Sequence, residues 1–326
     1  MRRTARILAG LILVLGLALA AAWAMAPREP FDLVPAFDDS ALPADLDGYL
    51  AAREATVGGI VPGAEKRILW AGAKGVRTPW AVVYLHGFSA TSEEIRPVPD
   101  LVAKGLGANL YFARFAGHGL GPGRFAGPSV NDWMIDVAEA LAIGKRIGER
   151  VLVIATSTGG TLAAEAALQP ALAAGMDGIV FVSPNFGLNL QMERLLDLPM
   201  ARVWAPLVAG RERCFEPVNA GHARYWTTCY PTEALLPMAA LARHAGRADY
   251  GAVRVPALFL YSPGDRVVRP AATKAVADGW GGGATVQEIT PGPKDDPWSH
   301  ILAGDILSPS MTAPVAARIL AWAKGL

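Results

Sequence analysis

The segment VLVIATSTGGTLAAEAAL, Val151–Leu168, decides how this sequence folds. Its first five residues, Val151–Ala155, are apolar and mostly branched, as in a strand that is buried on both faces. Hydroxyl residues and glycines follow at once, and then an alanine-rich stretch that is typical of a closely packed helix. Ser157 lies at this junction. It is either a nucleophile held on a sharp turn or a polar residue between two packed elements.

The same alternation of strand and helix runs along most of the chain. Apolar segments with β-branched or aromatic residues occur at 67–71, 80–87, 108–115, 150–157, 177–184, 256–265 and 285–290. Helical patterns occur at Asp45–Ala55, Ile95–Gly105, Val130–Ile147, Gly159–Leu168 and Pro270–Trp280. Nearly continuous apolar strands that alternate with helices predict an α/β fold with a mostly parallel sheet covered on both faces.

Residues 187–253 interrupt this alternation. They are rich in Arg, Trp, Leu, Met and Pro, and they contain both cysteines of the chain. A loop of this length without secondary structure is improbable inside a compact domain. We therefore expect an inserted helical cap over the carboxyl ends of the strands, where open α/β sheets bind their ligands. The cap's tryptophans and methionines either line an acyl pocket or bury the faces of the cap helices.

Size and charge exclude some classes of protein. The chain has 326 residues, of which 52% are hydrophobic, and a formal net charge of +1. This composition is sufficient for a large core, either in two domains or in one domain with an insertion. Because the sequence has no basic stripe, we expect no nucleic-acid partner.

The first residues, MRRTARILAGLILVLGLALAAAWAMAP, form a separate unit. Three arginines precede an uncharged run of about 20 residues, which is long enough to cross a bilayer as a helix. The same pattern fits a secretory signal peptide with a cleavage site near Ala22–Ala24. Both interpretations export the remaining chain, because the positive flank stays in the cytoplasm. We expect a periplasmic or other extracytoplasmic protein, anchored to the inner membrane if the helix is retained.

The cysteine content agrees with export. Cys214 and Cys229 lie in one segment, and in an oxidising compartment they can close a loop of about 15 residues. The alternative is two unpaired thiols in the core. The sequence has no CxxC motif and no flanking histidine pair, so we expect no zinc site and no other metal.

Ser157 has the local sequence of a nucleophile that is exposed on a strand-to-helix turn. Such a turn requires small residues two positions before and two positions after the serine. Here these are Ala155 and Gly159, which give A-T-S-T-G in place of G-x-S-x-G. No lysine follows the glycines, so a phosphate-binding P-loop is excluded.

A serine nucleophile needs a base and a group that orients the base. His300 lies in KDDPWSHILAG after the last predicted strand, and Asp265 lies in YSPGDRVV after the preceding one. The order serine, acid, histidine is that of α/β hydrolases, which predicts Ser157 as nucleophile, His300 as base and Asp265 as orienting acid. Asp295 and Asp296 are rival acids because they neighbour His300.

The oxyanion of an acyl transfer needs hydrogen-bond donors. One is expected to be the backbone N–H of Thr158, and the other that of Phe88, after the turn at Gly87. We expect His86 and His118 to anchor loops. The glycines at 117–123 precede no helix and lack the expected acidic residue, which argues against an NAD-dependent oxidoreductase.

Several of these segments together resemble the α/β-hydrolase superfamily, in particular its monoacylglycerol-lipase and carboxylesterase-like (serine aminopeptidase-like) branch. They are the His86–Phe88 loop, AGHGLG at 116–121, DWMIDVAEAL at 132–141, the Ser157 turn, PGDRVV at 263–268 and WSH at 298–300. The resemblance implies an α/β-hydrolase domain at 67–326 with a variable cap at 187–253. Residues 1–26 precede it as signal peptide or anchor, and 27–66 as linker and N-terminal segment.

The expected function is hydrolysis of carboxylic esters through an acyl-enzyme, without metal or cofactor. The apolar cap favours aliphatic esters or a monoacylglycerol-like lipid as substrate. If neutral His300 is required, activity falls below about pH 6.5. The alternatives are an amidase or peptidase on the same triad and a non-catalytic relative that binds a ligand. The non-catalytic alternative is disfavoured because all three triad residues are present.

Overall fold

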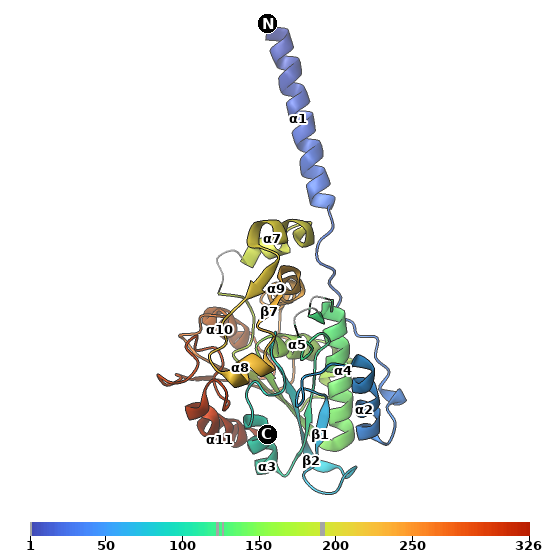
Figure 1. Cartoon of the computed structure of the whole chain (residues 1–326), viewed down its shortest axis with the longest axis vertical. Coiled ribbons are helices and arrows are strands. Elements are labelled where there is room, and N and C mark those ends of the chain that lie inside the picture. The colour runs from blue at the N-terminus through green and yellow to red at the C-terminus, as the bar shows by residue number, and fades with distance from the viewer. Residues whose placement is uncertain (1, 122–123, 126, 190–192) are drawn as a thin grey trace.

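The computed structural model describes residues 2–121, 124–125, 127–189 and 193–326. A seven-stranded sheet with the order β1-β3-β2-β4-β5-β8-β9 forms its centre (Figure 1). The strands are β1 (Arg67–Leu69), β2 (Thr78–Leu85), β3 (Asn109–Phe112), β4 (Gly148–Thr156), β5 (Gly178–Val182), β8 (Ala257–Tyr261) and β9 (Ala284–Glu288). All neighbouring pairs are parallel except β1 with β3. The predicted mostly parallel sheet is therefore confirmed.

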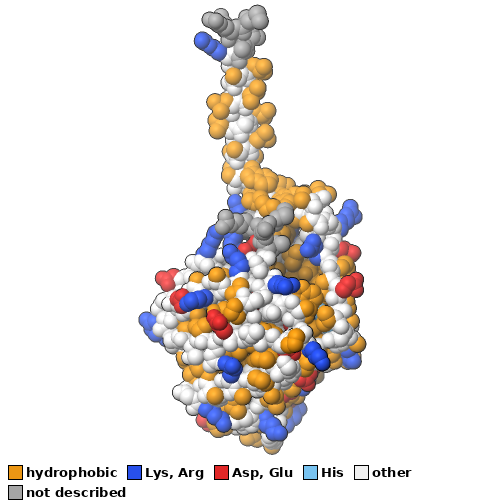
Figure 2. Space-filling model, turned by 90° about the vertical axis from the view of Figure 1, so that its left-hand side faces the viewer, with side chains coloured by type: hydrophobic (Ala, Val, Ile, Leu, Met, Phe, Trp, Pro, Cys, Tyr) orange, Lys and Arg blue, Asp and Glu red, His pale blue; other side chains and the backbone are white. Residues whose placement is uncertain are grey.

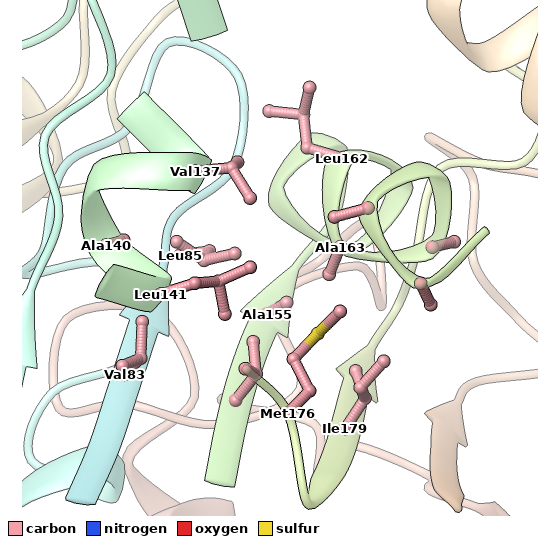
Figure 3. Close-up of a cluster of buried hydrophobic side chains, with 14 of the residues drawn as sticks. Val83, Leu85, Val137, Ala140, Leu141, Ala155, Leu162, Ala163, Met176 and Ile179 are labelled. Carbon is pink, nitrogen blue, oxygen red and sulfur yellow. The ribbon is translucent and has the colours of Figure 1, made fainter. Parts of the chain in front are cut away.

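Helices cover both faces of this sheet. One face carries α3 (Val98–Leu106) and α11 (Thr312–Ala323), and the other carries α4 (Val130–Ile147), α5 (Thr158–Ala167) and α10 (Pro270–Asp278). Strand β2 shows why: Val83 and Leu85 point into one buried cluster, and Val82 and Tyr84 into the other. In Figure 3, side chains of α4 and α5 meet those of the sheet in the first cluster. A strand that is apolar on both sides requires two such layers.

The predicted helices are present, with shifts at their ends. The helix at Val130–Ile147 has the predicted bounds, and Ser129 with Asp132 forms a capping box at its start. Helix α3 begins at Val98 instead of Ile95. Pro97 disfavours a helical conformation of the residue before it, so the helix begins only after this proline.

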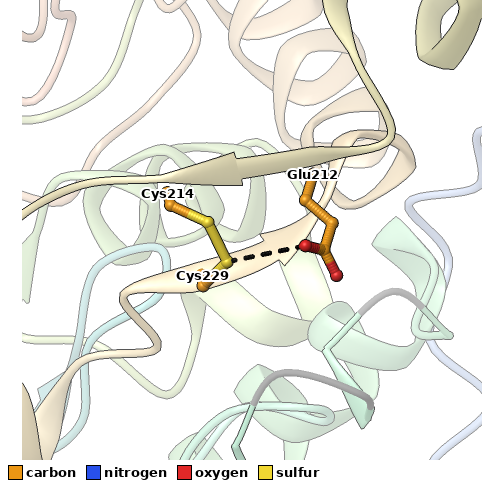
Figure 4. The surroundings of a disulfide bond; sticks show 3 residues. All are labelled: Glu212, Cys214 and Cys229. Atoms are coloured by element: carbon orange, nitrogen blue, oxygen red, sulfur yellow. Dashed lines mark hydrogen bonds between the residues drawn. A yellow bond between two sulfur atoms is a disulfide. The ribbon is translucent and has the colours of Figure 1, made fainter.

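The cap is partly helical and contains a hairpin that the sequence did not predict. Its elements are η3 (Glu193–Asp197), α7 (Ala201–Ala209), β6 (Glu212–Cys214), α8 (Ala220–Tyr225), β7 (Cys229–Pro231), η4 (Thr232–Ala234) and α9 (Leu235–Ala245). Strands β6 and β7 are antiparallel, with Cys214 opposite Cys229. These two cysteines form a disulfide, and the Glu212 carboxylate lies 4.0 Å from Cys229 Sγ (Figure 4). Three-residue strands carry too little periodicity to be recognised from sequence.

The N-terminal residues form two different structures. Helix α1 (Arg2–Met25) projects from the body of the molecule, and its apolar span Arg6–Met25 has a mean hydropathy of 2.5 with none of it buried (Figure 1). Helix α2 (Leu46–Val57) packs on the domain and buries Leu46 and Leu50 in its core. The short elements η1 (Asp39–Ala41), α6 (Pro170–Ala173) and η5 (Pro309–Met311) complete the described chain.

Candidate active site

Ser157 occupies the turn between β4 and α5 in a backbone conformation that residues other than glycine rarely adopt. Its backbone has φ 49° and ψ −116°. The Ser157 N–H donates to the Val182 carbonyl at 3.0 Å, and its carbonyl accepts from the Asn185 N–H at 3.1 Å. Strain of this kind costs about 1–3 kcal/mol and persists only where surrounding contacts enforce it. Both contacts come from β5 and the segment after it, so the neighbouring strand holds the turn.

The small residues around Ser157 are required by close packing. A Cβ on Gly159 would lie 2.4 Å from the Leu85 carbonyl oxygen, which excludes any side chain there. Ala155 is fully buried and pairs with Leu85 on one neighbouring strand and Phe181 on the other. The methyl group is therefore accommodated at the position where the family motif has glycine.

The structure brings Ser157, His300 and Asp265 together. His300 Nε2 lies 3.1 Å from Ser157 Oγ, and His300 Nδ1 lies 2.8 Å from Asp265 Oδ2. The other oxygen of Asp265 accepts from the N–H groups of Val267 and Val268 at 2.7 and 2.9 Å. The exposed fractions of Ser157, His300 and Asp265 are 6%, 7% and 4%. A carboxylate fixed by two backbone donors can hold the imidazole in one orientation.

The rival acids bind backbone instead of the imidazole. Asp296 Oδ2 accepts from the N–H groups of His300 and Ile301, each at 2.8 Å. Asp295 accepts from the Gly292 N–H at 2.7 Å. Both carboxylates thus shape the loop that carries His300, while Asp265 contacts its ring.

This arrangement determines the charge and tautomer of His300. Burial lowers the pKa of His300, but the neighbouring carboxylates, Asp265 first and then Asp296 and Glu94, together outweigh burial, and the net pKa is raised above 6.5. Because Nδ1–H donates to Asp265, the neutral ring presents the lone pair of Nε2 to the Ser157 hydroxyl. This is the geometry of a general base.

The loop with the predicted oxyanion donor lies directly against Ser157. A Cβ on Gly87 would lie 3.1 Å from Ser157 Cβ. The N–H groups of Phe88 and Thr158 donate to no other group in the described part of the chain. Thr158 is the first residue of α5, where N–H groups have no partner within the helix. Both N–H groups are therefore available, and their role toward an oxyanion stays a prediction.

His86 anchors this loop, as the sequence predicted. Its Nδ1 donates to the Gly87 carbonyl at 2.9 Å, and its Nε2 accepts from the Phe115 N–H at 3.1 Å. Burial holds the pKa of His86 well below 6.5, so the ring is neutral. His118 donates in the same way to the Ala116 carbonyl at 3.1 Å.

Comparison with known proteins agrees with this geometry. Residues 82–300 match the family described as the alpha/beta hydrolase family. The chain belongs to this family.

A relative of this hydrolase by sequence is a lipase. The thermostable monoacylglycerol lipase of Bacillus sp. (strain H-257) is 27% identical over 208 residues, which are 59% of this chain and 73% of that protein.

Solved structures establish the shared fold. A structure from the metagenome-derived lipolytic enzymes LipS and LipT has a TM-score of 0.66 at 19% identity, covering 82% of this chain and 100% of that chain. The monoacylglycerol lipase of Paleococcus ferrophilus has a TM-score of 0.58 at 17% identity, covering 79% and 98%. A monoglyceride lipase variant from Saccharomyces cerevisiae has a TM-score of 0.59 at 13% identity, covering 80% and 91%.

Glu94 is a residue of this hydrolase site that sequence reasoning missed. It is fully buried, and its Oε2 accepts from the Gly87 N–H at 2.7 Å and from the Tyr84 hydroxyl at 2.9 Å. Burial raises the pKa of Glu94 to about 7, although both hydrogen bonds oppose the shift. Glu94 follows another glutamate in a polar loop, and nothing in that pattern indicates which of the two is buried.

The cap of the hydrolase packs on the same loop. The ring of Phe88 contacts those of Phe125, Trp133 and Tyr230 at centroid distances of 4.8, 6.4 and 5.4 Å. Tyr230 belongs to β7 of the cap. A second contact joins the Thr227 N–H to the Ser89 carbonyl at 2.7 Å. Movement of the cap hairpin would therefore act on the segment that carries a predicted oxyanion donor.

Proposed function

We propose that this protein is a serine hydrolase that cleaves carboxylic esters through an acyl-enzyme. Ser157 is the nucleophile, His300 the general base and then acid, and Asp265 the residue that orients His300. The observation that carries this proposal is the pair of hydrogen bonds, 2.8 and 3.1 Å long, that joins the three side chains.

The proposed reaction has two halves. His300 Nε2 takes the Ser157 proton as Oγ attacks the ester carbonyl, and it then gives that proton to the leaving alcohol. A water molecule, deprotonated by the same nitrogen, hydrolyses the acyl-enzyme and releases the acid. The N–H groups of Phe88 and Thr158 stabilise the oxyanion in both halves, and loss of one such donor lowers the rate about 10²–10³-fold.

Aliphatic esters and monoacylglycerols are the proposed substrates. The aromatic cluster around Phe88 supplies apolar surface next to a predicted oxyanion donor. Three of the proteins named above are monoacylglycerol (monoglyceride) lipases. A series of p-nitrophenyl esters of increasing chain length tests this part, and rates that do not rise with chain length would contradict a lipid-like substrate.

The decisive experiment is labelling of the full chain, in detergent, with a fluorophosphonate. We expect labelling of the wild type and its loss in Ser157→Ala and His300→Ala. Ser183→Ala is the matched control, because Ser183 is another buried serine with positive φ at the end of the next strand. Labelling lost in the control as well would indicate misfolding, and a folded wild type that never labels would favour the non-catalytic alternative. Labelled protein that cleaves amides but not esters would favour the amidase alternative.

We further propose that the hydrolase is exported and stays attached to the inner membrane by α1. The support is a 20-residue apolar span that the body of the molecule leaves uncovered, and a disulfide, which persists in oxidising compartments. Fractionation of cells with mass spectrometry of the N-terminus tests this. Soluble periplasmic protein that begins near residue 25 would identify the segment as a cleaved signal peptide.

A further inference from the structure

Helix α7 exposes an apolar face at the outer end of the cap. The exposed fractions of Val203, Leu207 and Val208 are 58%, 78% and 69%, and their spacing puts them on one side of the helix. The side chains that α7 buries are Ala201 and Ala205. Trp204 and Pro206 are half-buried. The helix therefore leaves three large apolar side chains exposed while the side chains that it buries fully are alanines, which is unusual for a helix that only packs on a domain.

Helix α7 lies beside the C-terminal end of α1. Figure 1 shows α7 as the cap helix next to the end of α1, and in Figure 2 hydrophobic side chains gather at that end of the body. Residues just after α1 in the sequence bind the start of α7 and so fix the position of α7 relative to the end of α1. The Met200 N–H donates to the Pro27 carbonyl at 2.7 Å, two residues beyond the end of α1 at Met25.

An ion pair strengthens this connection. Both nitrogens of the Arg202 guanidinium that face Glu29 donate to its carboxylate, Nε at 2.8 Å and Nη2 at 2.5 Å. The Glu29 side chain is almost fully buried by this contact, at 1% exposed. Bidentate pairs of this kind restrict orientation as well as distance. We use the term exit clamp for these contacts of Pro27 and Glu29 with Met200 and Arg202.

We infer that α7 is a second membrane contact of this protein, and that its Val203, Leu207 and Val208 face enters the surface of the bilayer that α1 spans. This inference rests on the proposed role of α1 as an anchor. Two residues of extended chain reach at most about 7 Å, so the exit clamp holds the start of α7 within the headgroup layer. A short helix with an apolar face in that layer lies in the plane of the membrane. Arg211, Glu212 and Arg213 are exposed just after the helix, and their net charge of +1 adds a small attraction for anionic headgroups.

The consequence for the reaction is a route for substrate from the lipid phase. Helix α7 leads directly into β6, whose partner β7 carries Tyr230 against the ring of Phe88. Docking of α7 would therefore turn the cap, and the site beneath it, toward the membrane. An ester dissolved in the bilayer would reach Ser157 without crossing water, whereas a short soluble ester would not depend on this contact.

The test measures depth in the membrane rather than activity. The full chain carries a nitroxide on Leu207→Cys, in nanodiscs of phosphatidylethanolamine and phosphatidylglycerol that hold one copy each, so a second copy cannot cover the helix. The native cysteines are bonded to each other and do not react with the label. The control is Val76→Cys. Val76 is exposed in the loop before β2, at the amino ends of the parallel strands and so at the end of the sheet away from the cap.

We expect the label at position 207 to collide mainly with oxygen, and the label at position 76 mainly with a water-soluble nickel complex. Equal exposure of both labels to the nickel complex would overturn the inference. Val203→Cys repeats the measurement if Leu207→Cys does not fold, as judged by circular dichroism.

A second arm measures turnover. Leu207→Glu with Val208→Glu should lower hydrolysis of a monoacylglycerol in nanodiscs about fivefold to tenfold, since carboxylates are disfavoured near the bilayer. Hydrolysis of p-nitrophenyl butyrate should not change, and Val76→Glu should affect neither substrate. An equal loss on both substrates would contradict docking. A wild type without esterase activity would contradict the proposed function, while the label at position 207 would still decide whether α7 docks.

Discussion

At the scale of single residues, the proposed role of Asp265 toward His300 gives a specific prediction for turnover. Asp265→Asn keeps the size of the side chain but removes the charge that contributes most to raising the pKa of His300. The amide can also donate to Nδ1 and so favour the unproductive tautomer. We expect turnover to fall on the order of 10⁴-fold, as for a comparable change in other serine hydrolases. Asp278→Asn, an exposed carboxylate at the end of α10, is the control and should stay within a few-fold of the wild type.

The pH profile of turnover follows from the same contact. The proposed reaction needs neutral His300, so we expect activity above its pKa and its loss as pH falls through that pKa. Because the pKa of His300 is raised in the folded protein, the midpoint should lie above pH 6.5. That is higher than an unperturbed histidine would give. A kcat/KM profile with a midpoint below pH 6.5 would be inconsistent with this pairing.

Glu94 links stability to pH in the opposite sense from most carboxyl groups. Its folded pKa of about 7 exceeds the ordinary value of 4.5, so the folded protein retains a proton that the unfolded chain releases. Stability is therefore lost as pH rises from about 4.5 to 7, by up to about 3 kcal/mol. Glu94→Gln keeps an oxygen for the Gly87 N–H but does not ionise.

Urea unfolding at pH 5 and pH 8 measures this effect. The wild type should lose more free energy of unfolding between the two values than Glu94→Gln, because only the wild type ionises at this position. Equal losses in both proteins would show that the buried carboxyl does not titrate in this range. Groups that do not interact with Glu94 titrate in both proteins alike and cancel in the difference. His300 is the exception, because Glu94 contributes to its raised pKa, and His300→Ala in both backgrounds removes that contribution.

At the scale of elements, the hairpin β6–β7 depends on its disulfide. Replacement of Cys214 and Cys229 by serine removes a cross-link over 15 residues, which by chain entropy stabilises by about 3 kcal/mol. We expect a lower melting temperature and lower turnover, because β7 holds Tyr230 against Phe88. Differential scanning calorimetry of the double variant, beside wild type with and without reductant, checks this. An unchanged melting temperature would mean that the hairpin is held by its other contacts alone.

The sequence predicted the elements of the sheet better than those of the cap. Buried strands such as β4 carry continuous apolar runs, and α4 has a capping serine, so local pattern and tertiary role agree. In the cap, β6 has three exposed residues and no periodicity. The proximity of Ser157, Asp265 and His300 was predictable because each follows a strand whose carboxyl end meets the others at one edge. Glu94 was not, because its burial depends on Tyr84 and Gly87, which only the folded chain brings to it.

At the scale of the whole molecule, the exit clamp connects α1, the proposed membrane anchor, to the hydrolase domain. Without further contacts, the chain between Met25 and α2 would let the domain rotate freely relative to α1. The contacts of Pro27 and Glu29 with α7 remove that freedom within a few residues of α1. On the proposed role of α1, orientation toward the bilayer depends on the cap and the anchor together, and neither segment alone would provide it.

A charge swap tests this coupling. Arg202→Glu places a second carboxylate beside the buried Glu29 and should release the clamp, because an unpaired buried charge is far more costly than an exposed one. Glu29→Arg should release it as well, and the double swap should restore it, since the pair is re-formed with opposite polarity. In nanodiscs, each single variant should make a nitroxide at position 207 more accessible to water and lower monoacylglycerol turnover. The double variant should recover both, with p-nitrophenyl butyrate hydrolysis constant throughout. If the single variants leave the label as deep as in the wild type, the apolar face of α7 is sufficient for docking and the clamp does not orient the cap.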